Sequence, residues 1–272
     1  MQKVWFITGT SRGFGREWAI AALERGDKVI ATARDLSTIS GLSERFGDLV
    51  LPLRLDVTDK KAVDRSVVLA YEHFGRLDVV VNNAGYGLIG MIEEASEEEV
   101  RAQFEANFFG ALWVTQAALP IMREQKCGHI IQVSSIAGVS AFKGTGLYAS
   151  SKWALEGFSQ ALAQEVEGFN IAVTIVEPGG YATGWSESAT LTKELPAYKV
   201  VKEAADAARV ARMSQQGSPY ASRVAILEIV DSPHPPLRLF LGEAPFESVF
   251  ADYASRLATW EEWKDLSIRA QG

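Results

Sequence analysis

The sequence Val-Trp-Phe-Ile-Thr-Gly-Thr-Ser-Arg-Gly-Phe-Gly, residues 4–15, joins a short apolar run to a glycine-rich turn near the start of the chain. Gly9, Gly13 and Gly15 stand where a strand is expected to end and a helix to begin. Glycine lets the backbone turn tightly and approach a pyrophosphate closely, and the N-terminus of the following helix attracts negative charge. Three glycines also occur in ordinary turns, but their place between strand and helix favours a dinucleotide site.

Short apolar runs alternate with helical patterns over the first two-thirds of the chain. Runs that are apolar nearly throughout suit parallel strands covered on both faces, and they lie at 4–8, 28–33, 50–55, 77–82, 129–134 and 171–177. Helices are expected near 15–25, 59–74, 97–125 and 148–166, the third opened by a capping box of Ser96 and Glu99. This series of βαβ units predicts an α/β fold, a single-domain Rossmann-type doubly wound parallel sheet with helices on both faces.

The pattern changes after Pro178-Gly179. Residues 184–200 are expected to form a loop or short helices, 202–214 a helix, 236–242 a last strand and 245–266 one or two helices. The region 185–215 is a candidate substrate loop, and 243–272 is a C-terminal helical extension. Its Trp260 and Trp263 are expected to pack on the sheet or on another subunit. Because no linker interrupts the chain, residues 1–272 are expected to form one domain.

The composition is typical of a globular protein and narrows the classes of function. The 272 residues are 47% hydrophobic and 22% charged, with a formal net charge of −7. This acidic balance disfavours nucleic acid, whose phosphates require clustered basic residues. Cys127 is the single cysteine, so an intrachain disulfide and a cysteine zinc site are excluded, and the three histidines are scattered. With no apolar run of 18 residues and no signal peptide, we expect no membrane span and a cytoplasmic location.

The residues that follow the second predicted strand bear on the choice of dinucleotide. About 20 residues beyond the glycine loop, an NAD-binding unit usually carries an acidic residue for the ribose hydroxyls, whereas this chain has Ala33 and Arg34. A carboxylate would repel a 2′-phosphate, but Arg34, together with Arg12 in the glycine loop, would bind it. NADP(H) is therefore favoured over NAD. The neighbouring Asp35 weakens this inference, and both arginines are also compatible with solvated surface positions.

Polar residues also follow the third and fourth predicted strands. Asp56 and Val57 end the third, and Asn82-Asn83-Ala84-Gly85 ends the fourth. Open α/β sheets bind ligands at the carboxyl ends of their strands. Asp56 is therefore a candidate to bind the adenine amino group of the cofactor. It is also a candidate cap for the following helix, with Thr58 and Asp59 as competitors.

Tyr148 and Lys152 stand four residues apart in a helical stretch, which places both side chains on one face. A free tyrosine has a pKa of about 10 and is a poor base at neutral pH. A nearby ammonium, and the positive nicotinamide of an oxidised cofactor, would lower that pKa, so the pair would move a proton to or from an alcohol oxygen. Such a pair also arises by chance. Ser135, 13 residues upstream of Tyr148, would bind the substrate oxygen, with Ser134 as its alternative.

Together these residues resemble the short-chain dehydrogenase/reductase family. The matching features occur in the family's order and cover about residues 3–183: Thr8-Gly-x-x-x-Gly13-x-Gly15, Asn82-Asn-Ala-Gly85, Asn107, Ser135, Tyr148-x-x-x-Lys152 and Pro178-Gly179. The resemblance implies an NADP(H)-dependent oxidoreductase that interconverts a carbonyl and an alcohol by hydride transfer, with Tyr148 as proton donor or acceptor. It also favours a homodimer or homotetramer formed through the helices at 97–125 and 148–166.

The resemblance assigns a role to each candidate residue. Ser135 would position the carbonyl, Tyr148 would transfer the proton, and Lys152 would bind the nicotinamide ribose and tune Tyr148. Asn107 would hold a water that links Lys152 to solvent, and Thr183 would contact the carboxamide. The cofactor site then comprises Gly9, Ser11, Arg12, Gly13, Phe14, Gly15, Arg34, Asp56, Val57, Asn83, Ala84, Gly85, Tyr148, Lys152, Pro178, Gly179 and Thr183. The resemblance assigns no residue to a metal.

The stretches that the resemblance places against the substrate are mostly apolar or aromatic, as ligand pockets tend to be. Besides Ser135, the candidate substrate contacts are Tyr86, Val139, Phe142, Tyr181 and Trp185. They favour a fairly bulky apolar ketone, aldehyde or secondary alcohol. Core packing or dimer contacts would explain several of these residues equally well.

Three other functions share parts of this pattern. A sensor that binds the cofactor without catalysis is disfavoured by the presence of Asn107, Ser135, Tyr148 and Lys152 together. An epimerase or dehydratase usually has a differently spaced glycine loop and a larger substrate domain. An enoyl reductase usually separates its tyrosine and lysine by more than four residues.

Overall fold

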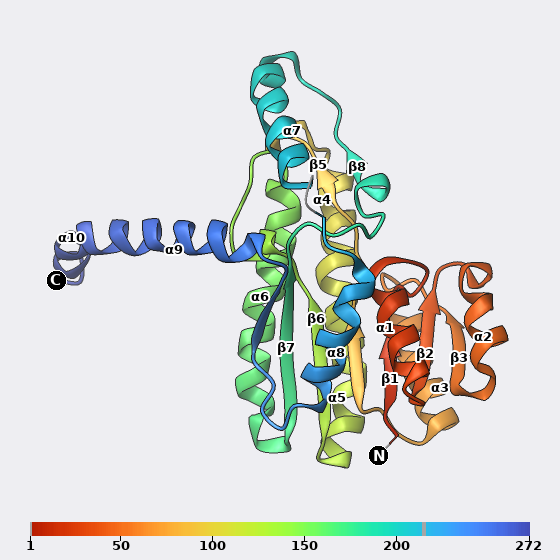
Figure 1. The fold of residues 1–272 in the computed structure, drawn as a ribbon. Helices are drawn as coiled ribbons and strands as arrows, with labels where there is room; N and C mark the ends of the chain where they lie inside the picture. Colours follow the sequence, from red (N-terminus) through yellow and green to blue (C-terminus); the bar gives the residue numbers. More distant parts are fainter. Residues whose placement is uncertain (1, 214–215) are drawn as a thin grey trace.

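A sheet of seven parallel strands forms the centre of the protein (Figure 1). The computed structural model describes residues 2–213 and 216–272. Because every pair in the sheet is parallel, the carboxyl ends of the strands share one edge. The doubly wound sheet expected from the sequence is thus confirmed. Across the sheet the strands are β3 (Val50–Arg54), β2 (Lys28–Ala33), β1 (Val4–Ile7), β4 (Val79–Asn82), β6 (Gly128–Val133), β7 (Ile171–Pro178) and β9 (Arg238–Leu241).

The two faces of the sheet pack against different helices, because successive side chains along a strand point to opposite faces. In β1, Trp5 and Ile7 belong to one buried cluster, and Val4 and Phe6 belong to the other. The first cluster is covered by α1 (Gly13–Glu24), α2 (Ser40–Phe46) and α8 (Ser222–Asp231). The second is covered by α3 (Lys60–Phe74), α5 (Gly110–Gln125) and α6 (Gly146–Val166). Helices therefore lie on both faces, as predicted.

The helical stretch predicted at 97–125 is confirmed, but a π-helical segment divides it into two α-helices. It begins at the predicted capping box, where Ser96 Oγ accepts from Glu99 N at 3.2 Å and Ser96 N donates to the Glu99 carboxylate at 2.8 Å. Helix α4 (Glu97–Phe104) then passes into a π-helical segment, Glu105–Phe109, before α5 begins. Such segments re-aim the side chains they carry and often lie at functional sites. This one carries Asn107.

Other elements fall beyond the predicted pattern. Helices α2 and α8 were not predicted, and a small parallel sheet pairs β5 (Leu88–Ile89) with β8 (Thr190–Leu191). The predicted loop at 184–200 contains β8 and short 3₁₀ turns. The predicted helix at 202–214 is α7 (Lys199–Met213), and Ser214 lies outside the described residues. The predicted substrate region at 185–215 likewise ends outside them, since Gln215 is not described.

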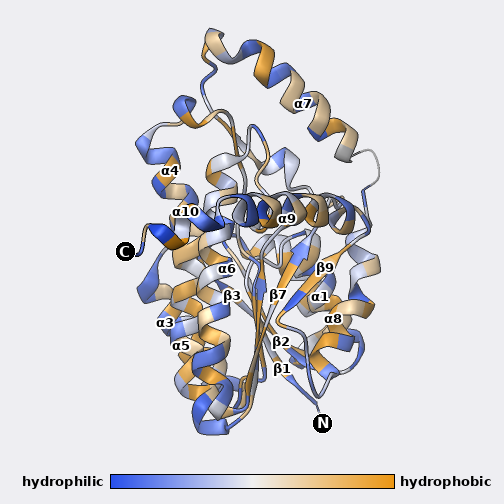
Figure 2. Ribbon diagram, turned by 90° about the vertical axis from the view of Figure 1, so that its left-hand side faces the viewer, coloured by the Kyte–Doolittle hydropathy of each residue, from blue (hydrophilic) through white to orange (hydrophobic). Residues whose placement is uncertain are grey.

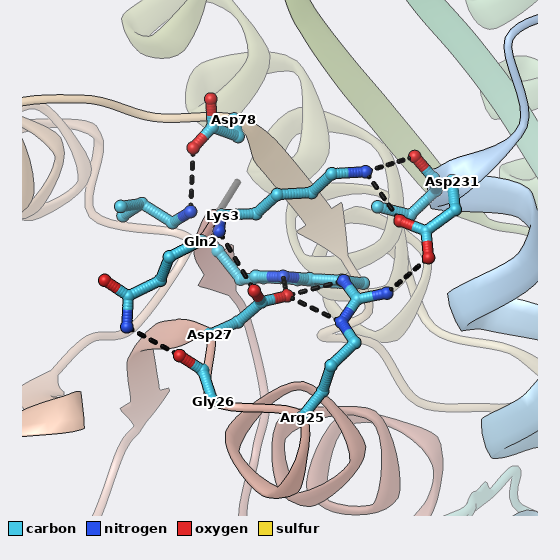
Figure 3. Close-up of polar contacts among 10 residues, drawn as sticks. Gln2, Lys3, Arg25, Gly26, Asp27, Asp78 and Asp231 are labelled. Carbon is cyan, nitrogen blue, oxygen red and sulfur yellow. Dashed lines mark hydrogen bonds and ion pairs between the residues drawn. The ribbon is translucent and has the colours of Figure 1, made fainter.

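A network of charged groups ties the amino ends of the central strands to α8 (Figure 3). The buried Asp27 carboxylate accepts hydrogen bonds from Lys3 N, Trp5 Nε1 and the Arg25 guanidinium. Lys3 Nζ and Arg25 Nη1 each reach the Asp231 carboxylate, at 2.8 and 2.7 Å. This clasp, Lys3–Trp5–Arg25–Asp27–Asp231, closes the edge of the sheet opposite the carboxyl ends of the strands.

The C-terminal extension forms α9 (Ala244–Glu262) and α10 (Lys264–Arg269), as the sequence predicted. Helix α9 begins against β9 and then leaves the body of the protein, so that its far end and α10 project from it (Figure 1). Figure 2 views the molecule from the side toward which α9 projects, with α9 in front of the body. Trp260 and Trp263 are exposed and do not pack on the sheet, which excludes one of the two predicted positions for them. Within residues 2–213 and 216–272, no helix combines the length and apolar character needed to cross a membrane.

Candidate active site

A cavity of about 1230 Å³ lies at the carboxyl ends of the strands. Strand β1 has β2 on one side and β4 on the other, so the chain order reverses there, and open α/β sheets bind ligands at such a switch point. The structure brings most of the predicted site residues to this cavity: Gly9, Ser11, Arg12, Gly13, Phe14, Arg34, Asp56, Val57, Asn83, Ala84, Gly85, Tyr86, Ser135, Phe142, Tyr148, Lys152, Pro178, Gly179, Tyr181, Thr183 and Trp185. Gly15, Asn107 and Val139 do not line it.

The glycine loop is held against the loop after β4. Thr8 Oγ1 accepts from the backbone N–H groups of Asn83 and Ala84, both at 2.9 Å, and Asn83 Nδ2 donates to the carbonyls of Thr8 and Gly9. A β-carbon at Gly15 would lie 2.4 Å from both Asn83 Nδ2 and the Gly9 carbonyl oxygen. Gly15 therefore serves the close packing of the two loops rather than the cavity wall.

Two basic side chains line the cavity: Arg34, which follows β2, and Arg12, which lies beside Gly184 in the segment after β7. Arg12 and Arg34 are exposed at its wall, and within the described residues neither forms an ion pair. Asp35 does not line the cavity, because its carboxylate accepts from Ser37 N at 3.0 Å and caps a short 3₁₀ turn. Its hydrogen bonds with Ser37 hold the pKa of Asp35 below its usual value. The Asp35 carboxylate is therefore bound by Ser37 and does not line the cavity beside Arg34.

The structure decides between the two roles that the sequence left open for Asp56. Asp56 lines the cavity, and its Oδ1 accepts from Thr58 N at 3.0 Å and from Thr58 Oγ1 at 2.8 Å. The cap of α3 is instead Asp59, whose carboxylate accepts from Ala62 N. Asp56 therefore shapes the turn that presents it to the cavity without capping the helix.

Helix α6 and the loop after β6 bring Tyr148, Lys152 and Ser135 together. Tyr148 and Ser135 lie beside each other in the cavity wall, and the Ser135 hydroxyl acts to lower the pKa of Tyr148. Ser135 Oγ accepts from Ala137 N at 3.1 Å. Lys152 lies one turn after Tyr148, its Nζ 5.9 Å from the centre of the Tyr148 ring, and donates to the Val133 carbonyl at 2.8 Å. All three line one cavity, so a carbonyl oxygen beside Tyr148 would meet two hydroxyl groups.

Burial sets the protonation of Tyr148 and Lys152. It raises the pKa of Tyr148 to about 12, against the lowering effect of the Ser135 hydrogen bond, and it lowers the pKa of Lys152 to about 8, against the raising effect of Glu156. The expectation that Lys152 lowers the pKa of Tyr148 is not met by the chain on its own. Desolvation opposes the charged form of both groups and outweighs their mutual effect. The phenol is therefore protonated at neutral pH.

Asn107 lies behind the cavity and fixes its wall. Its Oδ1 accepts from Tyr86 N at 3.0 Å, and its Nδ2 donates to the Tyr86 carbonyl at 3.0 Å and to Ser151 Oγ at 3.1 Å. A β-carbon at Gly85 would lie 2.8 Å from Asn107 Oδ1 and 3.7 Å from Lys152 Nζ. Asn107 and Lys152 thus converge on Gly85, where only a residue without a side chain fits.

Two buried carboxyl groups that the sequence analysis missed lie behind Lys152. Glu156 is one turn further along α6, and Glu177 precedes Pro178 at the end of β7. Arg238 Nη1 lies 3.1 Å from Glu156 Oε2, and its Nε lies 3.8 Å from Glu177 Oε1. Burial and the like charge of the neighbour raise the pKa of Glu177 to about 8, and burial also raises the pKa of Glu156. No local motif marks these residues, because their meeting depends on the pairing of β7 with β9.

Aromatic side chains form the end of the cavity near Tyr148. The rings of Trp185 and Tyr148 have centroids 5.0 Å apart, and Trp185 lies so close to Gly87 that a β-carbon there would be 2.1 Å from it. Phe142 packs in the same group, while the rings of Tyr181 and Phe14 meet at a tilt of 58° with their centroids 4.9 Å apart. Val139 is buried away from the cavity, and its carbonyl accepts from Arg256. The first turns of α9 add wall residues that sequence reasoning missed: Ala244, Glu247, Ser248 and Ala251.

The cavity fits a dinucleotide. It is continuous from Arg12 and Arg34, past the glycine loop, to Tyr148 and Lys152. Gly13 has φ +59°, and a β-carbon there would lie 3.0 Å from the Thr183 side chain, so the cradle beside the N-terminus of α1 is open only because it is glycine. An open, backbone-lined helix N-terminus is suited to a pyrophosphate.

Known proteins resemble the chain over most of its length. A sequence model described as short chain dehydrogenase matches residues 3–194. "Oxidoreductase BOA17" of Botryotinia fuckeliana is 42% identical, over 98% of this chain and 99% of its own. "3-ketodihydrosphingosine reductase" of Bacteroides thetaiotaomicron is 41% identical, over 69% of this chain and 67% of its own.

Solved structures have the same fold. A short-chain dehydrogenase from Streptomyces avermitilis has a TM-score of 0.93 and 38% identity, with all of both chains covered. A short-chain dehydrogenase/reductase from Burkholderia phymatum in complex with NAD has a TM-score of 0.84 and 21% identity, with 95% of both chains covered. An alcohol dehydrogenase from Thermococcus sibiricus complexed with 5-hydroxy-NADP has a TM-score of 0.74 and 26% identity, over 89% of this chain and 96% of its own.

Proposed function

The chain belongs to the short-chain dehydrogenase family, and from this premise we propose that it is an NADP(H)-dependent oxidoreductase that interconverts a carbonyl and an alcohol. The observation that carries the proposal is the meeting of Ser135 and Tyr148 in the wall of the cavity that starts at the glycine loop. Lys152 lies one turn along the same helix. Tyr148 is thus an acid beside a second hydroxyl group, that of Ser135, at the end of a cavity that fits a dinucleotide.

The residues divide the work of carbonyl reduction. A bound nicotinamide supplies the hydride to the carbonyl carbon. Ser135 and Tyr148 hold the carbonyl oxygen by hydrogen bonds, and Tyr148, protonated at neutral pH, gives its proton to that oxygen as the negative charge develops. Lys152, held by the Val133 carbonyl, stabilises the phenolate that remains, and Asn107 supports the wall through which a water would return the proton. Alcohol oxidation reverses these steps.

The basic end of the cavity supports NADP(H) as the preferred cofactor. Arg12 and Arg34 are exposed at the wall, and the Asp35 carboxylate is engaged by Ser37. A 2′-phosphate would meet two cations there and no carboxylate from Asp35, whereas the ribose hydroxyls of NAD would find no acidic partner at Ala33. Asp56 would face the adenine.

The aromatic end supports a bulky apolar substrate. Phe142 and Trp185 pack with Tyr148, and Tyr86 and the first turns of α9 line the same cavity. A relative that is 41% identical over 69% of this chain is named for the reduction of a keto group on a sphingoid base. We therefore propose a ketone, aldehyde or secondary alcohol with a large apolar substituent as the substrate.

The free Cys127 suits a reducing compartment, and we propose the cytosol as the location of the protein. We also propose that the chain forms a homodimer or homotetramer.

The experiment that tests this function follows NADPH absorbance while purified protein is offered ketones and aldehydes with apolar substituents of increasing size. The proposal predicts that at least one class of carbonyl oxidises NADPH, that NADH serves less well, and that kcat/KM rises with the apolar substituent. Binding of NADPH without oxidation by any member of the panel would contradict the proposal and favour a cofactor-binding sensor.

A further inference from the structure

The far end of α9 and the whole of α10 are exposed to solvent. We call residues 257–272 the arm, and every one of them is exposed. The last tie to the body is Arg256, whose guanidinium donates to the Val139 carbonyl at 3.1 Å and lies over the Trp153 ring. All residues after Arg256 are exposed, and the end of α9 projects from the body (Figure 1).

An exposed apolar stripe runs along α9 on a face of its own. It consists of Phe246, Phe250, Tyr253, Leu257 and Trp260, whose side chains are 42–64% exposed. Their spacing of four, three, four and three residues is that of a helix that packs along a second helix, with the a and d positions of a heptad in the seam. Most of the residues that hold α9 to the body lie on a neighbouring face: Pro245, Val249, Asp252 and Arg256. In the stripe, Phe246 also contacts Phe240 of β9 edge to face.

Exposure of the stripe and the arm to water is unfavourable in free energy, and a partner that covered them would remove this cost. An isolated helix of about 15 residues is marginal in water, because most helical stability in proteins comes from the burial of an apolar face. The arm is no longer than this and buries no apolar face, while Leu257, Trp260, Trp263, Leu266 and Ile268 are all at least half exposed. A contiguous apolar surface of this size on a protein marks an interaction site.

We propose that the stripe and arm of one chain pack against the same surface of a second copy, as an antiparallel pair of helices that joins two chains into a dimer. An isologous contact needs only one self-complementary surface, and a heptad seam is such a surface. The stripe and arm together expose eight large apolar side chains, each with roughly 100 Å² to bury. The sum, roughly 800 Å² from each chain, is what a stable protein interface requires.

The charge of this region argues against a membrane as the occupant. Residues 243–272 carry six carboxylates and three basic side chains. Helices that lie on anionic bilayers have polar faces rich in Lys and Arg, so this acidic surface is unsuited to them. The proposed interface also differs from one through α5 and α6, because neither helix contributes a residue to the stripe.

The first test measures the mass of the assembly by light scattering during gel filtration at tens of micromolar protein. A chain with both Leu257→Glu and Trp260→Glu should form assemblies of half the wild-type mass. Val224→Glu, which places the same charge at an exposed apolar position on α8, should leave the mass unchanged. Since all three side chains are exposed, circular dichroism should report the same helix content for each protein. A monomeric wild type, or a double variant with the wild-type mass, would overturn the proposal.

The second test reads the packing of the two helices directly. In a Cys127→Ser chain, single cysteines are introduced as Tyr253→Cys, Leu257→Cys and Trp260→Cys, and mild oxidation is followed by non-reducing electrophoresis. At least one of the three should give a covalent dimer, because an antiparallel seam brings a stripe position close to its own copy at the two-fold axis. Ser255→Cys, on the opposite side of the helix, should not. Crosslinking of none of the three stripe variants, or monomeric wild type that floats with phosphatidylcholine vesicles, would contradict the arrangement.

Discussion

At the scale of single residues, the spacing of groups along the sequence predicts their positions in the cavity but not their pKa values or their contacts. The four-residue spacing places Tyr148 and Lys152 on one face of α6, as predicted, but their pKa values are displaced in opposite directions by burial. Ser134 and Ser135 are adjacent in sequence, yet Ser135 lies beside Tyr148 and acts to lower its pKa, while the Ser134 hydroxyl is buried and lies near Glu156. Spacing identifies the candidates, and only the packed structure assigns their chemistry.

Arg34→Asp should change the choice of cofactor. The substitution replaces a charge-assisted hydrogen bond to the 2′-phosphate, worth about 1.5–3 kcal/mol, with repulsion. We expect the Kd for NADPH to rise tenfold or more and the Kd for NADH to stay within about twofold, measured by fluorescence titration. Lys61→Asp, which makes the same charge change on the exposed surface of α3, is the control. An equal loss for both dinucleotides would mean that Arg34 does not contact the 2′-phosphate.

Glu177→Gln should change how stability depends on pH. Burial raises the pKa of Glu177 from its usual 4.5 to about 8, so between these values the folded state keeps a proton that the unfolded state has released. This protonation favours folding fully below about pH 4.5, and its benefit is lost as the pH rises through 8. The variant should therefore gain stability relative to the wild type between pH 5 and 8, on the order of 1–3 kcal/mol.

Urea denaturation at pH 5, 6.5 and 8 measures this difference. The exposed Glu165→Gln on α6 provides the matched control and should follow the wild type at every pH. If Glu177→Gln and the wild type keep a constant difference across this range, Glu177 does not hold a proton in the folded protein.

At the scale of elements, the sequence predicts those parts that a local pattern determines. The buried strands, the capping box of α4 and the helices of the C-terminal extension were found because periodicity and capping residues mark them. The π-helical segment around Asn107 was not found, because its register follows from hydrogen bonds with Tyr86 and Ser151, 21 and 44 residues away. Helix α2 is short, and α8 lies on the sheet through contacts with α1, so neither has a strong signal of its own.

The clasp between β1, α1 and α8 should contribute to the free energy of unfolding without affecting the binding of NADPH in the cavity. Asp27→Ala would leave the Trp5 indole N–H and the Arg25 guanidinium without their buried acceptor. The loss of one partner from such a buried network costs about 2–4 kcal/mol. Urea denaturation should show this loss, and binding of NADPH below the transition should be unchanged. Asp64→Ala, which removes an exposed ion pair with Lys60, should cost less than about 1 kcal/mol. A similar small cost for Asp27→Ala would contradict the assigned role of the clasp.

At the scale of the whole molecule, the parallel sheet places the residues of the cavity at one edge and the stabilising clasp at the other. The glycine loop, Asp56, Asn83 and Ser135 follow different strands, and they meet because all these strands end at one edge. The clasp and the amino ends of the strands lie at the other edge (Figure 3). This convergence could be predicted from the sequence. The meeting of Glu156, Glu177 and Arg238 could not, because β9 joins the sheet beside β7 after a long excursion of the chain through α7 and α8.

The account rests on Tyr148 as the group that gives its proton to the carbonyl oxygen, and Tyr148→Phe tests it most directly. The change removes one hydroxyl group and keeps the ring that packs against Trp185. With a carbonyl compound that the wild type reduces, we predict that the Kd for NADPH stays within about twofold and that kcat falls by about 10²–10⁴-fold, the usual contribution of a general acid. A fall in kcat of less than about tenfold, with NADPH binding intact, would contradict the account.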